Sequence, residues 1–215
     1  MRIGVFDSGV GGQSVANAIL LAMPELDVLL REDREHLPYG NKTKEELLKL
    51  VTPILHEMVG AGCEIIVVAC NTVSTTIIEQ LRKVCTVPLI GLEPMVKPAA
   101  EQTATGVIAV CATPSTLASD RYAWLKQQYA PGVTVIEPDC ADWSYMIEYS
   151  QIDHAKISAQ IIDALQQDAD VIVLGCTHYH WIEQEIRELC EDKAIVLQPE
   201  DAVVAQLKQA IAQLS

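Results

Sequence analysis

Two cysteines occupy equivalent places in this sequence, each directly after a short apolar run. Residues 65–69 lead into Cys70, and residues 171–175 lead into Cys176. Polar residues follow each cysteine at once, which favours chemistry over packing at both positions, because a thiolate can act as a nucleophile or a base. One thiol in each part of the chain predicts a site that places a thiol on both sides of a substrate.

The two apolar runs have the composition of strands that are buried on both faces. Both are continuous and rich in β-branched residues, which is typical of parallel strands covered by helices on each side. Open α/β sheets bind ligands beyond the carboxyl ends of their strands. We therefore expect Cys70 and Cys176 to lie at strand ends that face a ligand.

Four apolar runs in the first part of the chain recur in the same order in the second part. The expected strands pair as residues 3–6 with 108–111, 26–29 with 133–136, 65–69 with 171–175, and 87–90 with 194–197. Helical periodicity covers residues 42–59, 72–84, 113–128, 153–167, 179–190 and 200–214. Strands that alternate with helices imply parallel sheets with right-handed crossovers.

This repeat predicts an α/β fold of two pseudo-symmetric, doubly wound parallel-sheet domains, with the active site in the cleft between them. We expect an N-terminal domain over residues 1–97 and a second domain over 98–199, because residues 93–98 interrupt both periodicities. The helix of residues 200–215 is expected to pack back on the first domain. Cys70 and Cys176 would then face each other across one cleft.

Composition narrows the classes of function. The 215 residues suffice for one large or two small domains, and 29 acidic against 15 basic residues give a net charge of −14. The sequence has no basic stripe, so we expect no nucleic-acid partner. It has no stretch of membrane-spanning length and no basic leader, so we expect no membrane association and a cytoplasmic location. Seven cysteines without a C-x-x-C pattern predict reduced thiols.

Three short segments could supply polar groups to the cleft. The glycine-rich turn of residues 7–12 could bring its backbone close to a ligand or serve only as a turn, and it lacks a nucleotide-binding pattern. Pro38-Tyr39-Gly40 is typical of a turn, here at the cleft rim. The hydroxyls of residues 113–116 suit a carboxylate, while Thr113 is also expected to cap a helix with Pro114 at its first position.

The cysteines admit three kinds of chemistry. Cys176, His178 and His180 have the side chains of a zinc site, but their spacing matches no closed site and no fourth ligand is evident, so we expect no metal. A redox pair is an alternative if the two thiols approach closely. Acid–base chemistry is favoured, because both cysteines precede helices that could lower a thiol pKa, with Asp7 and His178 as proton partners.

Taken together, the segments resemble the signature sequences of glutamate racemases, in the aspartate/glutamate racemase superfamily. The resemblance rests on Asp7-Ser8-Gly9, Pro38-Tyr39-Gly40, Ala69-Cys70-Asn71-Thr72 and Gly175-Cys176-Thr177-His178-Tyr179, and it spans almost the whole chain. It implies a cofactor-independent isomerase that interconverts L- and D-glutamate by proton transfer at Cα through two thiols. Such an enzyme supplies D-glutamate for peptidoglycan.

The resemblance also implies roles for individual residues. Cys70 would act on the D-enantiomer with help from Asp7, and Cys176 on the L-enantiomer with help from His178. Glu148 is expected near the substrate ammonium. The implied substrate-binding residues are Asp7, Ser8, Pro38, Tyr39, Gly40, Asn71, Thr72, Thr113, Thr116, Glu148, Thr177 and His178. The family commonly forms homodimers.

The sequence departs from the family pattern at several places, including residues 91–94, which are one residue short of the family's inter-domain turn. His180 and Trp181 follow Tyr179 where the family has Pro-Leu, and residues 141–145 replace an apolar, proline-containing stretch. Asp142 in that stretch would repel a substrate side-chain carboxylate or point to solvent. Two alternatives therefore stay open: the same thiol chemistry on aspartate or a related acid, and a weakly active paralogue with a regulatory or binding role.

Overall fold

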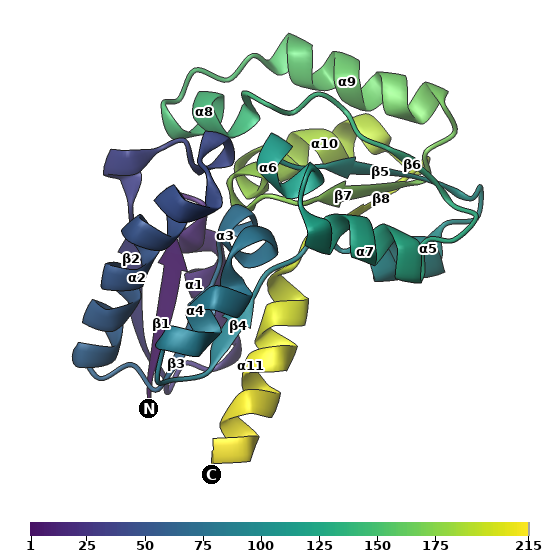
Figure 1. The fold of residues 1–215 in the computed structure, drawn as a ribbon. Helices are drawn as coiled ribbons and strands as arrows, with labels where there is room; N and C mark the ends of the chain where they lie inside the picture. The colour runs from purple at the N-terminus through teal and green to yellow at the C-terminus, as the bar shows by residue number, and fades with distance from the viewer. Residues whose placement is uncertain (215) are drawn as a thin grey trace.

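The structure, a computed structural model, describes residues 1–214 as two α/β halves (Figure 1). Each half contains one four-stranded sheet, in the order β2-β1-β3-β4 in the first half and β6-β5-β7-β8 in the second. All six strand pairings are parallel. The predicted fold class is confirmed, and the identical strand order shows the internal repeat. Ser215, which the expected last helix included, lies outside the described residues.

The first half is built around the sheet that ends in Cys70. Its elements are β1 (Arg2–Asp7), α1 (Gly12–Ala22), β2 (Asp27–Glu32), the short 3-10 helices η1 (Arg34–His36) and η2 (Tyr39–Asn41), α2 (Lys44–Gly60), β3 (Ile65–Val68), α3 (Asn71–Thr76), α4 (Ile78–Val84) and β4 (Leu89–Gly91).

The second half repeats this plan around the sheet that ends in Cys176. Its elements are α5 (Val96–Gln102), β5 (Val107–Cys111), α6 (Pro114–Leu117), α7 (Asp120–Tyr129), β6 (Thr134–Ile136), α8 (Trp143–Glu148), α9 (His154–Gln166), β7 (Val171–Leu174), the 3-10 helix η3 (Thr177–Ile182), α10 (Glu183–Cys190) and β8 (Ile195–Leu197). The chain then enters α11 (Glu200–Leu214).

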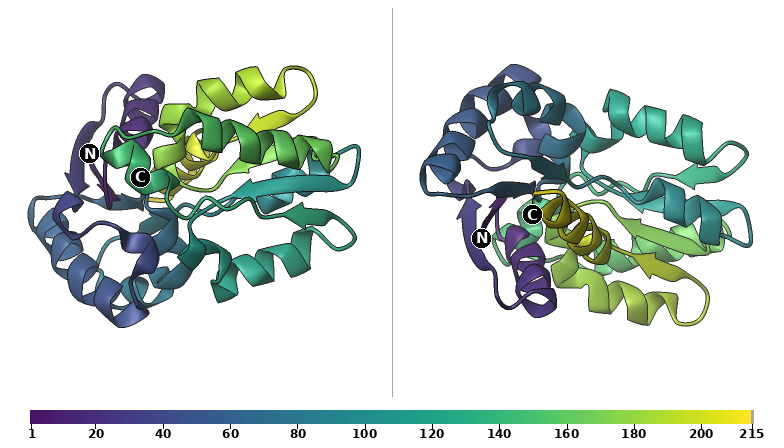
Figure 2. Two further views of the ribbon diagram at one scale, coloured as in Figure 1. Left: turned by 90° about the horizontal axis from the view of Figure 1, so that it is seen from above. Right: turned by 90° about the horizontal axis from the view of Figure 1, so that it is seen from below.

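Helices cover both faces of each sheet, as the apolar strands require (Figure 2). In the first sheet, alternate residues point to opposite layers. Phe6 and Val68 pack among the apolar side chains of α2 and α4, whereas Ile3 and Val5 pack against α1 and α11. The two faces of this sheet are thus covered by two separate apolar layers.

Each half is completed by a helix that follows the last strand of the other half. α5 follows β4, yet Val96 and Ala99 pack in the core of the second sheet. α11 follows β8, yet Val203 and Leu207 pack in the core of the first sheet, and Figure 1 shows α11 alongside β4. The chain thus crosses between the halves at residues 92–95 and again at 198–199. The predicted boundary at residue 97 falls inside α5, which begins at Val96. The apolar side chains of this helix belong to the core of the second half.

Three predicted helices are interrupted in the structure. Residues 72–84 form α3 and α4, which separate where Ile77 leaves the helical conformation with φ of −134°. Residues 113–128 form α6 and α7, because the Ser119 side chain accepts a hydrogen bond from the Tyr122 N–H and starts a new helix. Residues 179–190 divide into η3 and α10. Apolar spacing cannot detect such breaks when both pieces bury the same side.

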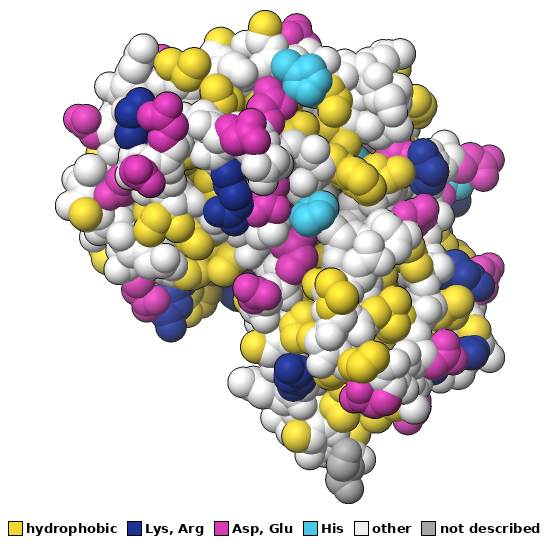
Figure 3. Space-filling model, turned by 180° about the vertical axis from the view of Figure 1, so that it is seen from behind, with side chains coloured by type: hydrophobic (Ala, Val, Ile, Leu, Met, Phe, Trp, Pro, Cys, Tyr) yellow, Lys and Arg dark blue, Asp and Glu magenta, His cyan; other side chains and the backbone are white. Residues whose placement is uncertain are grey.

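The surface agrees with the acidic composition. In the view of Figure 3, acidic side chains are spread over the face and Lys and Arg side chains occur singly among them. None of the helices within residues 1–214 is long and apolar enough to cross a membrane.

Candidate active site

Both thiols line one cavity between the two halves. Cys70 and Cys176 each follow the end of a central strand by two residues, β3 in the first half and β7 in the second. The cavity is lined by Ser8, Leu37, Tyr39, Gly40, Cys70, Asn71, Thr72, Thr113, Ser144, Cys176, Thr177 and His178. Its volume is about 20 Å³, which is room for about one water molecule. The structure therefore shows the two halves closed over the thiols.

Burial sets the protonation state of Cys70. Burial and the neighbouring Asp7 charge raise the pKa of the Cys70 thiol to about 12, although hydrogen bonds with Ser8 and with the backbone N–H of Val73 act in the opposite direction. Ser8 Oγ lies 3.5 Å from the Cys70 sulfur. The helix that follows Cys70 does lower this pKa through the Val73 N–H, but the expected net lowering is wrong, because desolvation of the thiolate outweighs the donors. Cys70 is a protonated thiol at neutral pH in this closed form.

Asp7 is a buried carboxyl group that titrates near neutral pH. Burial raises the pKa of Asp7 to about 6, against the lowering effects of the His178 charge and of hydrogen bonds from the Ser8 backbone and Thr177. Oδ2 accepts a hydrogen bond of 3.1 Å from Thr177 Oγ1. Oδ1 is buried without a partner among residues 1–214. A carboxyl group of this kind can exchange protons with its surroundings at physiological pH.

His178 is placed to compensate a negative charge on Cys176. Its Nδ1 lies 3.9 Å from the Cys176 sulfur, and its Nε2 lies 2.9 Å from Glu148 Oε2. Burial alone would lower the pKa of His178, but the hydrogen bonds with Cys176 and Glu148 prevail and raise it to about 10. The ring is therefore an imidazolium at neutral pH, beside a sulfur that can carry the opposite charge.

Glu148 lies behind His178 rather than at the cavity. Besides His178, it accepts hydrogen bonds from the Val10 N–H at 3.0 Å and from Arg34 Nε at 2.5 Å. Burial would raise the pKa of Glu148, but the donors His178, Val10 and Arg34 lower it to about 2. Glu148 is not part of the wall of the thiol-lined cavity, and in this closed form its two oxygens accept hydrogen bonds from these three donors.

The loop after β1 packs against the second half. A Cβ at Gly11 would lie 2.6 Å from the main-chain carbon of Thr177, closer than two such atoms can approach. Gly9 similarly faces Glu148 and His178. None of the glycines of this turn lines the cavity. In the closed form Gly9 and Gly11 allow the two halves to meet.

Hydroxyl and amide side chains cover the remaining wall of the cavity. Thr72 Oγ1 lies 2.9 Å from Thr113 Oγ1, which in turn donates to Thr116 Oγ1 at 3.0 Å. Thr113 also caps α6 with Pro114 in the first turn, as predicted. Thr116 is fully buried behind Thr113 and does not reach the cavity. Both amide atoms of Asn71 are buried without a partner among residues 1–214, so this side chain is available to a ligand.

Some residues at the site were not predicted. Leu37 and Ser144 line the cavity, and they also line a small neighbouring cavity together with Pro38 and Glu148. Ser144 stands four residues before Glu148 in α8, so both lie on one helix face. This spacing from Glu148 could have been used to predict Ser144 as a residue of the site. The contact of Arg34 with Glu148 left no signal, because the two residues are remote in sequence.

The unusual residues around position 142 do not alter the cavity. Asp142 pairs with Lys156 at 2.6 Å and is not part of the cavity wall. Trp143 is fully buried, and its ring N–H donates to Gln160 Oε1. Trp181 is 54% exposed and also lies outside the cavity wall. Within residues 1–214, no three His, Cys, Asp or Glu side chains are arranged to hold a metal ion.

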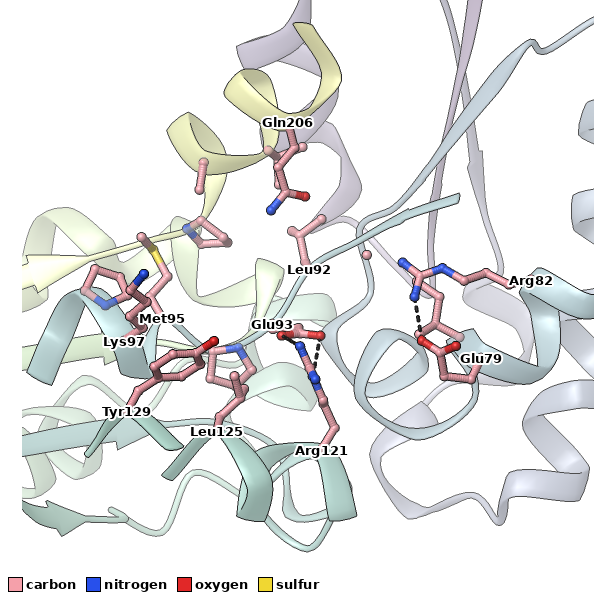
Figure 4. A pocket seen from close by; sticks show the side chains of 17 residues that line it. Glu79, Arg82, Leu92, Glu93, Met95, Lys97, Arg121, Leu125, Tyr129 and Gln206 are labelled. Atoms are coloured by element: carbon pink, nitrogen blue, oxygen red, sulfur yellow. Dashed lines mark hydrogen bonds and ion pairs between the residues drawn. The ribbon is translucent and has the colours of Figure 1, made fainter. Parts of the chain in front are cut away.

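A second, larger cavity lies where the chain crosses between the halves (Figure 4). Its volume is about 470 Å³, and its wall includes the crossing residues 92–95 and Pro199. The arginines here are already paired, Arg121 with Glu93 and Arg82 with Glu79. No cysteine or histidine is present in its wall. The thiol-lined cavity is therefore the candidate reaction site.

Comparison with known proteins agrees with this geometry. Residues 24–207 match the family model described as Asp/Glu/hydantoin racemase. The chain is 37% identical to a glutamate racemase of Pseudomonas syringae pv. tomato, over 97% of this chain and 78% of that protein. It is 35% identical to a glutamate racemase of Roseiflexus sp., over 97% of this chain and 79% of that protein.

Solved structures show the same similarity. The crystal structure of Escherichia coli glutamate racemase, in complex with L-glutamate and the activator UDP-MurNAc-Ala, superposes with a TM-score of 0.91. The match covers 98% of this chain and 82% of that one, at 26% sequence identity.

Proposed function

The chain belongs to the Asp/Glu/hydantoin racemase family, and from this premise we propose that it interconverts L- and D-glutamate by proton transfer at Cα. One observation carries the proposal. Two buried thiols stand at corresponding strand ends of the two halves and line the same cavity. A racemase without a cofactor needs an acid and a base on opposite faces of the carbon. Paired thiols meet that need.

The protonation states favour one starting direction. The His178 imidazolium compensates a Cys176 thiolate, which removes the Cα proton of L-glutamate and becomes a thiol. The electron pair left on Cα is delocalised into the α-carboxylate. The Cys70 thiol then delivers its proton to the opposite face, which gives D-glutamate and leaves Cys70 as a thiolate. The reverse reaction uses the same groups with exchanged roles.

The thiols return to their starting states between turnovers. Asp7, with a pKa of about 6, carries the returning proton to Cys70 and is left as a carboxylate. The proton gained by Cys176 leaves to solvent when the halves open, and the His178 imidazolium keeps its own proton and stabilises the thiolate that forms. Net proton balance is kept because one thiol gains the proton that the other loses. These assignments follow from the neighbours of each sulfur, Ser8 and Asp7 for Cys70, and His178 for Cys176.

Polar groups of the cavity wall would hold the substrate. Asn71 offers an unpartnered amide, and Ser8, Thr72 and Thr113 offer hydroxyls that can donate to a carboxylate. Because the closed cavity has room for about one water molecule, glutamate enters only when the halves open. The same halves then close over the substrate and exclude water from the carbanion.

The proposal extends to the cellular setting. D-glutamate produced here would serve peptidoglycan synthesis, as in the family it resembles. The mechanism requires both thiols reduced, and all seven cysteines are free in the structure, which favours the cytoplasm. A homodimer is the assembly that the family resemblance favours, and sedimentation velocity on the purified protein distinguishes it from a monomer.

Deuterium incorporation tests the reaction directly. The reduced protein is incubated with L-glutamate in deuterated water, and the product is analysed by chiral chromatography with mass spectrometry. We expect D-glutamate with one deuterium at Cα. L-aspartate in a parallel reaction tests the alternative substrate. A folded, reduced sample that neither racemises nor exchanges any of these acids would contradict the proposal.

A further inference from the structure

Glu148 forms hydrogen bonds with both halves of the molecule beside the second thiol, Cys176. Its side chain is 3% exposed and comes from α8 of the second half. Two of its three donors, Val10 N–H and Arg34 Nε, come from the first half, and the third is His178. The carboxylate that orients the partner of Cys176 is therefore held by groups that reach it only when the cleft is closed.

We propose that Arg34 is a positioning residue for this reaction, which fastens the closed cleft by binding Glu148 and thereby holds His178 against Cys176. The proposal rests on the proposed function. Arg34 does not line the cavity, so it acts through Glu148 and not on the substrate. Its side chain is 54% exposed, while its partner Glu148 is buried.

The two first-half donors divide the oxygens of Glu148 between them. Arg34 occupies Oε1, and Val10 shares Oε2 with His178. A buried carboxylate needs all of its oxygens hydrogen-bonded, since an unpaired one carries a desolvation penalty. Opening the cleft removes Val10 and Arg34 together. In the closed form Arg34 is the partner of Oε1, whereas Val10 and His178 bind Oε2, so loss of the Arg34 side chain leaves Oε1 without this partner beside His178.

Charge explains why an arginine is suited to this position. Burial is the main cause of the raised pKa of Glu32, which lies at the end of β2. The nearby Arg34 charge lowers this pKa, and the nearby Glu148 charge raises it. Arg34 is therefore attracted by two carboxylates, Glu148 of the second half, which it contacts at 2.5 Å, and Glu32 of the first half. Without its charge these carboxylates repel each other across the closing surface. Arg34 converts a repulsive contact between the halves into an attractive one.

The test compares Arg34→Gln with Arg34→Lys and with Arg31→Gln as matched control. Arg31 lies three residues earlier in β2, and within residues 1–214 its side chain donates only to the carbonyl of its neighbour Leu30, so its substitution removes the same charge without touching the second half. We expect Arg34→Gln to lower kcat by roughly tenfold, with a smaller change in KM. Arg34→Lys should restore part of the loss, because it keeps the charge. Arg31→Gln should match the wild type.

Thiol alkylation gives a second measurement that does not depend on activity. Iodoacetamide is added without substrate, and modification of Cys70 and Cys176 is followed by peptide mass spectrometry, with the partly exposed Cys85 as internal reference. We expect Arg34→Gln to be alkylated several times faster than Arg31→Gln at Cys70 and Cys176, and equally at Cys85. Equal kcat values and equal alkylation rates for the two variants would overturn the proposal. A wild type that does not racemise would contradict the proposed function, whereas the alkylation comparison would still decide whether Arg34 holds the cleft closed.

Discussion

Thr177 Oγ1 donates a 3.1 Å hydrogen bond to Asp7 Oδ2 across the boundary between the halves. Thr177 directly follows Cys176, and Asp7 is the charged neighbour of Cys70. The proton partner of one thiol is therefore held by the half that carries the other thiol. Closure of the cleft completes both sides of the site at once.

Single replacements of the two thiols should separate exchange from inversion. We expect Cys70→Ser and Cys176→Ser each to lower racemisation by roughly 10³-fold, because one face of Cα then has no effective acid or base. Any remaining deuterium incorporation should occur with L-glutamate for Cys70→Ser and with D-glutamate for Cys176→Ser. Chiral analysis in deuterated water measures both. Cys85→Ser, a cysteine remote from the cavity, serves as control, and unimpaired racemisation by either thiol variant would refute the two-thiol mechanism.

The pH dependence of kcat/KM should show the titration of Asp7 and His178. With D-glutamate as substrate, Asp7 must be ionised to accept the proton of Cys70, and its pKa is raised to about 6 by burial. His178 must keep its proton, and its pKa is raised to about 10. The rate should therefore rise through about pH 6 and fall towards about pH 10. Asp7→Asn should remove the acid limb and lower the maximum. If the acid limb persists unchanged in Asp7→Asn, another group produces it.

The same carboxyl group should limit stability. Its folded pKa of about 6 exceeds the ordinary value of 3.8, so the folded protein binds the proton more tightly than the unfolded chain. Wild-type stability should fall as pH rises through this window and stay lower above it. Asp7→Asn should raise the free energy of unfolding by about 1–3 kcal/mol at pH values above 6. Urea unfolding measures this gain, which should disappear below about pH 4. A gain of equal size at both pH values would point to a cause other than titration.

Asn71 should contribute to binding and not to stability. Its amide atoms are buried without partners among residues 1–214, so Asn71→Ala removes polar atoms that the folded protein does not satisfy. We expect the KM for glutamate to rise by roughly tenfold or more, while the free energy of unfolding is unchanged or higher. Steady-state kinetics and urea unfolding of one preparation give both values. A marked loss of stability would show that Asn71 has a structural partner. Asn17→Ala, on the exposed face of α1, is the control.

The strand framework and the two thiols were predictable because local sequence determines them. Continuous β-branched runs mark strands buried on both faces, and Cys70 and Cys176 follow such runs directly. The parallel order in the two halves then follows from the repeat. Local patterns did not show the breaks at Ile77 and Ser119, since an interrupted helix keeps the same apolar spacing.

The environment of each catalytic group was not predictable, because it depends on closure of the cleft. The raised pKa of Cys70 follows from burial that the second half completes. Glu148 turns away from the cavity because Val10 and Arg34, both distant in sequence, donate to it. Asp142 is neutralised by Lys156 from another helix. These contacts are properties of the packed structure and have no local pattern.

The exchange of α5 and α11 between the halves has a consequence for how the chain folds as it is made. One face of the first sheet is covered by α1 together with α11, and the ribosome produces α11 only after the entire second half. Until then α1 covers only part of this face, and the part next to β4 that α11 covers remains exposed to water. The first half cannot reach its final stability during synthesis, so the two halves should complete folding together and unfold as one cooperative unit.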